Sequence, residues 1–155
     1  MSYLFPLSLL NSELLEYKGI KYTPLNSNDY DFNFISLLEQ LTVTQCNKEQ
    51  FLHRFHQLRS NGDYYTIVAT DIASNQVVGT ATLIITKRFI HTMNQVGHIE
   101  DVVVDEKYRG KRIGYMLIKH LQFIANNKCY KLILDCSLKN VPFYEKLDMI
   151  KKEVQ

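Results

Sequence analysis

"GHIEDVVVDEKYRGKRIG", residues 97–114, joins a strand pattern to a turn pattern. Two acids, Glu100 and Asp101, precede the apolar run 102–104, and glycines and basic residues crowd the segment 109–114. A short β-branched run between polar residues is typical of a strand, whereas clustered glycines mark a turn. The stretch therefore predicts a strand that ends near Asp105, then a tight turn that opens a helix.

The chain on either side alternates between helix and strand patterns. Apolar residues at helical spacing predict helices at 29–41, 47–58, 113–127 and, more briefly, 140–147. β-branched and aromatic runs predict strands at 64–70, 76–90, 98–104 and 130–136, with a loop at 23–29. The order α-α-β-β-β-α-β-α favours a mixed α/β sheet built from antiparallel hairpins and one strand–helix–strand crossover.

The length, charge and composition of the chain limit the class of protein to which it can belong. A length of 155 residues fits a single domain, 1–155, in which residues 1–20 form an N-terminal extension. We expect that extension to belong to the mature protein and to dock as a short helix, because it lacks a basic start and Pro6 interrupts its apolar stretch. A net charge of +2 argues against a nucleic-acid surface, and no apolar run approaches the roughly 20 residues of a membrane span.

The three cysteines indicate a reducing compartment. An odd number argues against a disulfide framework, so a cytoplasmic protein is expected. The sequence gives no sign of a metal site.

The turn at 104–114 has the chemistry of an anion site. Glycines leave backbone N–H groups pointing one way at the start of a helix, where the helix dipole adds positive charge. Arg109, Lys111 and Arg112 add counter-charge. On these residues alone, a phosphate site and a solvated loop both remain open.

Several motifs, in one order, resemble a known family. "YRGKRIGYMLI" (108–118) is similar to motif A of the Gcn5-related N-acetyltransferase (GNAT) superfamily. "GHIEDVVV" (97–104), "CYKLILDC" (129–136) and "NVPFYEKL" (140–147) resemble the eukaryotic glucosamine-6-phosphate N-acetyltransferases. The likeness covers residues from about 20 to 147, which is most of the chain.

The resemblance implies both fold and activity. It implies a GNAT fold: a mixed, mostly antiparallel sheet with helices on both faces and a splayed pair of central strands. It also implies direct acetyl transfer from acetyl-CoA, a co-substrate, to the 2-amine of glucosamine 6-phosphate in a ternary complex. The product would feed UDP-GlcNAc synthesis. A cytoplasmic homodimer is implied, with no metal, nucleic acid or membrane partner.

The resemblance also assigns roles to residues. It places acetyl-CoA against Val102, Val103, Val104, Arg109, Gly110, Lys111, Arg112, Ile113, Gly114, Asn140 and Tyr144. Glu100, Asp101 and Asp135 match positions that contact the sugar and its amine, and Tyr144, Asp135 and Glu100 match the catalytic ones. Lys87 and Arg88 are either ordinary edge-strand charges or contacts for the sugar phosphate or coenzyme A.

The two acids are neighbours in the sequence, which limits how both can contact one substrate. In a regular strand Glu100 and Asp101 face opposite ways, so both reach one substrate only if the strand bulges.

Three features depart from the family pattern. Arg112 replaces the middle glycine of motif A, and Asp148 follows Leu147 where the family has a glycine. The family continues through a strand bearing an arginine for the partner subunit's substrate phosphate, whereas this sequence ends "IKKEVQ". We expect either further residues or another phosphate ligand. Two alternatives stay open: a GNAT enzyme for another amine, and a non-catalytic acyl-CoA-binding module.

Overall fold

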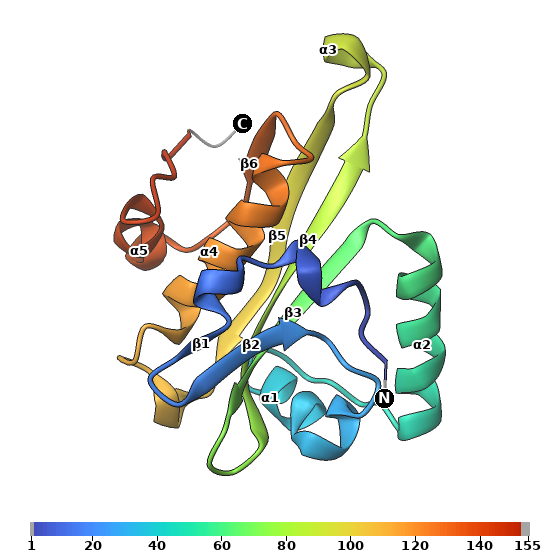
Figure 1. The fold of residues 1–155 in the computed structure, drawn as a ribbon. Helices are drawn as coiled ribbons and strands as arrows, with labels where there is room; N and C mark the ends of the chain where they lie inside the picture. The colour runs from blue at the N-terminus through green and yellow to red at the C-terminus, as the bar shows by residue number, and fades with distance from the viewer. Residues whose placement is uncertain (1, 153–155) are drawn as a thin grey trace.

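One six-stranded sheet forms the centre of the protein (Figure 1). The structure, a computed structural model, describes residues 2–152. The strands lie in chain order: β1 (Glu16–Tyr17), β2 (Ile20–Pro24), β3 (Tyr64–Asp71), β4 (Gln76–Lys87), β5 (Gln95–Val104) and β6 (Lys131–Ile133). Neighbours from β1 to β5 are antiparallel, and β5 is parallel to β6. The predicted mixed, mostly antiparallel sheet is confirmed.

Helices cover both faces of this sheet (Figure 1). The α-helices are α1 (Phe34–Glu39), α2 (Lys48–Asn61), α3 (Ile90–Met93), α4 (Ile113–Asn126) and α5 (Val141–Glu145). Five 3₁₀ turns complete residues 2–152: η1 (Leu7–Leu9), η2 (Ser12–Leu14), η3 (Asp29–Phe32), η4 (Glu106–Tyr108) and η5 (Leu138–Asn140). α4 supplies the predicted crossover between β5 and β6. No helix within residues 2–152 is long and apolar enough to cross a membrane.

Four segments differ from the sequence prediction. The single helix expected at 29–41 is divided into η3 and α1, because Asn33 between them has φ 77°. Residues 16–24 form the hairpin β1–β2, part of which was expected as loop; its strands are too short for their alternation to stand out. β4 ends at Lys87, before a left-handed turn in which His91 and Thr92 have positive φ. β6 covers three residues instead of the predicted 130–136, because it diverges from β5 after Ile133.

Gly79 lets α4 approach the sheet closely. A Cβ at this position would lie 2.9 Å from Ile113 and 3.2 Å from Leu117, nearer than carbon atoms pack. Both of these α4 side chains are buried. The first turn of α4 is therefore held against β4, and the 109–114 turn before it is held at the end of the sheet.

The N-terminal segment docks on the core as expected, through the short 3₁₀ helices η1 and η2. Leu4 and Phe5 are buried. His120 of α4 is buried as well, and its Nε2 lies 2.8 Å from the carbonyl oxygen of Leu14. This contact ties the segment to the helix that carries the 109–114 turn.

Candidate active site

The two parallel strands diverge beside the acidic pair. β5 pairs with β6 only from Val96, opposite Lys131, to His98, opposite Ile133. β5 then continues to Val104, and within residues 2–152 no strand pairs with that edge. Backbone N–H and C=O groups on such an edge can bind an extended amide-containing ligand. The predicted splay is confirmed.

A bulge lies in β5 at the acidic pair. Thr80 pairs with Val103 and Thr82 with Glu100, so β5 carries one residue more than β4 across this step. Asp101 has φ 53°, in the left-handed region, and both Glu100 and Asp101 are exposed. A bulge breaks the alternation of side chains between the two faces. The condition under which both acids can serve one ligand is therefore met.

The 109–114 turn presents free backbone donors. Gly110 has φ 83° and Arg112 has φ 63°; Arg112 is the N-cap of α4. Within residues 2–152, none of the N–H groups from Arg109 to Gly114 donates a turn, cap or side-chain hydrogen bond. The first N–H groups of a helix have no partner inside it, so they remain available to an anion.

α5 lies beside the opening that forms where β5 and β6 diverge. A Cβ on Gly114 would lie 3.4 Å from the Phe143 ring and 3.6 Å from Val104, which shows how closely α5, β5 and the turn meet. The Phe143 and Tyr144 rings pack edge to face at 4.9 Å. Burial, and then the nearby Cys136 thiol, raise the pKa of the Tyr144 hydroxyl. Tyr144 therefore stays a proton-bearing donor across the neutral range.

The backbone conformation of Asp148 accounts for one departure from the family pattern. Asp148 ends the α5 region with φ 62°, the left-handed conformation that a glycine would hold there without strain. Arg112, at φ 63°, occupies the other glycine position in the same way. Both substitutions keep the backbone shape that glycine allows.

The remaining predicted residues lie at two ends of the site. Asp135 and Glu100 each lie two residues beyond the last β5–β6 pair, His98 and Ile133, so both follow the point at which the two strands diverge. Asn140 is exposed at the end of η5, just before α5.

Lys87 and Arg88 are not brought to the acidic pair within one chain. Thr82 pairs with Glu100, and Lys87 lies five residues farther along β4, about 16 Å away at strand rise. Lys87 instead pairs with Asp63, Nζ to Oδ1 at 3.4 Å.

Two hydrogen bonds that stabilise the segment before the turn could not be predicted from the sequence. Tyr108 donates from its hydroxyl to Oδ2 of Asp71 at 2.5 Å. Gln40, at the end of α1, accepts a 3.1 Å hydrogen bond from the N–H of Glu106. Neither pair has a sequence signature, because the partners lie 37 and 66 residues apart.

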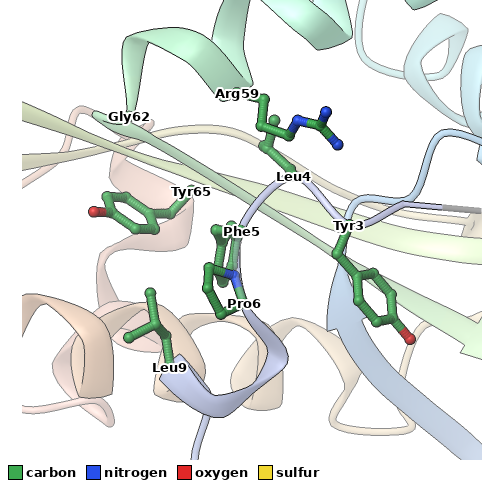
Figure 2. A pocket seen from close by; sticks show the side chains of 8 residues that line it. All are labelled: Tyr3, Leu4, Phe5, Pro6, Leu9, Arg59, Gly62 and Tyr65. Atoms are coloured by element: carbon green, nitrogen blue, oxygen red, sulfur yellow. The ribbon is translucent and has the colours of Figure 1, made fainter.

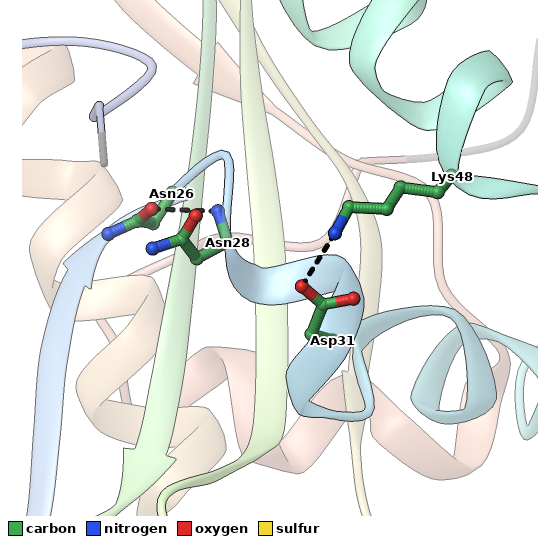
Figure 3. Close-up of polar contacts among 4 residues, drawn as sticks. All are labelled: Asn26, Asn28, Asp31 and Lys48. Atoms are coloured by element: carbon green, nitrogen blue, oxygen red, sulfur yellow. Dashed lines mark hydrogen bonds and ion pairs between the residues drawn. The ribbon is translucent and has the colours of Figure 1, made fainter.

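The loops around α1 and α2 are fixed by local polar contacts (Figure 3). Lys48 pairs with Asp31 at 2.9 Å, and the Asn28 N–H donates to Oδ1 of Asn26 at 2.8 Å. The Lys48–Asp31 pair joins the start of α2 to η3, and the Asn28–Asn26 bond fixes the loop before η3.

A separate hollow lies away from all these residues. It has a volume of about 470 Å³ and lies between the N-terminal segment, the end of α2 and the start of β3 (Figure 2). Its lining is mainly apolar and includes Phe5, Leu9 and Tyr65, with Arg59 among them. None of the predicted site residues lines it, so the candidate site is the splayed opening and not this hollow.

Comparisons with known proteins identify the family of this chain. Residues 32–149 match the acetyltransferase (GNAT) family model. The chain is 43% identical over 139 residues to glucosamine 6-phosphate N-acetyltransferase 1 of Dictyostelium discoideum, covering 88% of each chain. It is 41% identical to the Arabidopsis thaliana enzyme of that name, covering 87% of this chain and 93% of the relative.

Solved structures give the same result. The crystal structure of the Arabidopsis thaliana glucosamine-6-phosphate N-acetyltransferase superposes with a TM-score of 0.84, at 40% identity over 88% of this chain and 95% of that one. A Trypanosoma brucei acetyltransferase superposes with a TM-score of 0.80, at 36% identity over 88% of this chain and 96% of that one. With motif, fold and opening in agreement, this chain belongs to the GNAT acetyltransferases and, within them, to the glucosamine 6-phosphate N-acetyltransferase family.

Proposed function

We propose that this protein transfers the acetyl group of acetyl-CoA to the 2-amine of glucosamine 6-phosphate. The observation that carries the proposal is the splayed β5 edge, with the acidic bulge at its start and the 109–114 turn beyond its end. Relatives at 40–43% identity that carry this name support the substrate. They do not favour another amine or a non-catalytic module.

Two regions of the opening suit two parts of acetyl-CoA. The backbone of Val102, Val103 and Val104 would hold the pantetheine amides, because no strand in the described part of the chain pairs with this edge. The N–H groups of 109–114 would hold the pyrophosphate at the start of α4. The side chain of Asn140 would complete the cofactor contacts near Tyr144.

The acids Glu100, Asp101 and Asp135 would hold the amine of the sugar. An ordinary amine with a pKa of about 7.7 is about one-sixth neutral at pH 7, and selecting that form costs only about 1 kcal/mol. A carboxylate, directly or through water, can accept the proton as nitrogen attacks the thioester carbonyl. No strong base is needed.

Positioning supplies most of the rate acceleration. Aligning amine and thioester can be worth up to about 7–11 kcal/mol. As the C–N bond forms and the C–S bond breaks, the negative charge passes to the thiolate of coenzyme A. Tyr144 donates a hydrogen bond to that sulfur, and its raised pKa favours donation over full proton transfer.

We further propose a cytoplasmic homodimer that serves UDP-GlcNAc synthesis. Phe89, Ile90 and Met93 at the tip of the β4–β5 hairpin are 87%, 58% and 66% exposed, as expected for an interface that a single chain leaves open. Lys87 and Arg88 stand at the base of that tip and would serve the substrate phosphate of the partner subunit's site. The three free cysteines suit a reducing compartment.

The test is thiol release from acetyl-CoA with three acceptors: glucosamine 6-phosphate, glucosamine and a lysine peptide. Turnover confined to the phosphorylated sugar supports the proposal. Equal turnover with glucosamine would show that the phosphate is not recognised, and no turnover with any acceptor would exclude the activity for residues 1–155.

A further inference from the structure

Three side chains on the first two turns of α4 form one cationic–aromatic group, the Tyr115 cluster. The Arg112 guanidinium carbon lies 4.3 Å from the centre of the Tyr115 ring, and Lys119 Nζ lies 5.6 Å from it. Arg112 is three residues before Tyr115 and Lys119 four after it, so all three share one helix face. Cations over an aromatic face are attracted to its quadrupole, which fixes where these two charges stand.

The positive charges of the cluster have no acidic partner in the part of the chain that the structure describes. The ion pairs within residues 2–152 are Lys48–Asp31 and Lys87–Asp63, both outside this region. Lys111 is different, because it lies 5.0 Å from the ring of Tyr108, outside the cluster. Two like charges held on one ring without a counter-charge favour an anion at that place.

The cluster also adjoins the free amides of the turn. Arg112 is both the N-cap of α4 and the residue whose side chain lies on Tyr115. The opposite face of α4 packs into the core through Ile113, Met116 and Leu117. The cluster is therefore on the open face, one to two helical turns beyond the amides of 109–114.

We infer that Arg112 and Lys119, held on Tyr115, bind the 3′-phosphate of coenzyme A and make the enzyme select it over its 3′-dephospho form. The inference rests on the proposed function, because it needs the pyrophosphate on the turn. Once the amides hold that group, the 3′-phosphate is the remaining anion of the ligand. A guanidinium matches phosphate oxygens in a bidentate way, and a glycine at position 112 could not do so.

The experiment measures the dissociation constants of coenzyme A and 3′-dephospho-coenzyme A by calorimetry at low ionic strength. The variants are Arg112→Gly, Lys119→Ala and Lys128→Gln. Glycine adopts φ 63° freely, so Arg112→Gly keeps the turn and its amide while removing the side chain. Lys128→Gln removes the same charge beyond the far end of α4, about 20 Å away along the helix.

The native protein should bind coenzyme A about tenfold more tightly than the dephospho form, as expected for a charge-assisted phosphate contact. Arg112→Gly should reduce that ratio to about two, Lys119→Ala should reduce it partly, and Lys128→Gln should leave it unchanged. Equal affinity of the native protein for both ligands, or an unchanged ratio in Arg112→Gly, overturns the inference and leaves the proposed function standing. Failure to bind either ligand overturns both.

Discussion

Tyr108 and Asp71 join two segments that are 37 residues apart, through a 2.5 Å hydrogen bond from the Tyr108 hydroxyl to Oδ2 of Asp71. Asp71 ends β3 and also accepts from the Ala73 N–H at 3.0 Å, so its carboxylate is held by its own turn. Tyr108 directly precedes Arg109. The bond therefore links the β3–β4 hairpin to the turn whose amides we propose as the binding site of the cofactor pyrophosphate.

Removing this bond should weaken acetyl-CoA binding more than it slows the chemistry. We expect Tyr108→Phe to raise KM for acetyl-CoA several-fold and to leave kcat within about twofold, because the lost contact orders a binding turn. Asp71→Asn retains an acceptor oxygen and is the matched control, with a smaller rise in KM. Steady-state kinetics check both. A fall in kcat at unchanged KM would contradict this role.

Tyr144→Phe should change kcat, whereas Tyr108→Phe should change KM. Loss of the hydroxyl removes the proposed hydrogen-bond donor to the leaving sulfur, so kcat should fall about 100-fold, the lower range for a positioned acid, with KM for both substrates nearly unchanged. The pKa of Tyr144 is raised by burial, so native kcat should stay level through pH 8 to 9. The measurement is kcat against pH for both proteins. A native kcat that declines below pH 8 together with near-native turnover in the variant would exclude the assignment.

Two substitutions of Asp101 distinguish the contribution of its charge to substrate binding from the contribution of its backbone conformation to stability. Asn tolerates the left-handed conformation, so Asp101→Asn should fold normally while raising KM for glucosamine 6-phosphate about tenfold through loss of charge. Asp101→Val places a β-branched residue at φ 53° and should lower stability by about 1–2 kcal/mol. Thermal melts and kinetics distinguish the two. The assignment fails if Asp101→Asn binds the sugar as well as the native protein does.

The central sheet and the crossover helix could be predicted from the sequence because their patterns are long. β3 and α4 start at the predicted residues and end within one residue of the prediction, since each buries a continuous apolar face. The hairpin β1–β2 could not, because two to five residues carry too little alternation. Elements of this length depend on the neighbour with which they pair.

The details of the site depended on pairing that the sequence does not encode locally. "GHIEDVVV" placed the acids on β5, but the bulge that exposes both exists only in the register of β5 against β4. The Tyr108–Asp71 bond depends on two turns that meet only after the sheet forms. Arg112 was visible as a departure from a glycine, whereas its contact with Tyr115 needed the helix geometry.

His120 should make stability depend on pH in the mildly acidic range. Burial lowers the pKa of its imidazole, although the hydrogen bond to the Leu14 carbonyl partly opposes the shift. Because the folded-state pKa lies below the unfolded value of about 6.5, the unfolded chain takes up the proton first, and stability falls as pH drops below about 6.5. His120→Gln can keep the donor to Leu14 without titrating, so its melting temperature should fall less between pH 8 and 5.5. Parallel losses in the two proteins would contradict this origin.

Asp29 should produce a dependence of the opposite sign. Burial raises the pKa of its carboxyl from 3.8 to about 6, partly offset by the hydrogen bond from the Asn26 N–H and by Lys21. The folded state therefore holds the proton more tightly, and stability falls as pH rises from about 4 to 6, by up to about 3 kcal/mol. Asp29→Asn keeps an oxygen acceptor for Asn26 without the charge. Its melting temperature should exceed the native value by several degrees at pH 8, and the gain should shrink toward pH 4. A gain that is constant with pH would trace the effect to packing and not to ionisation.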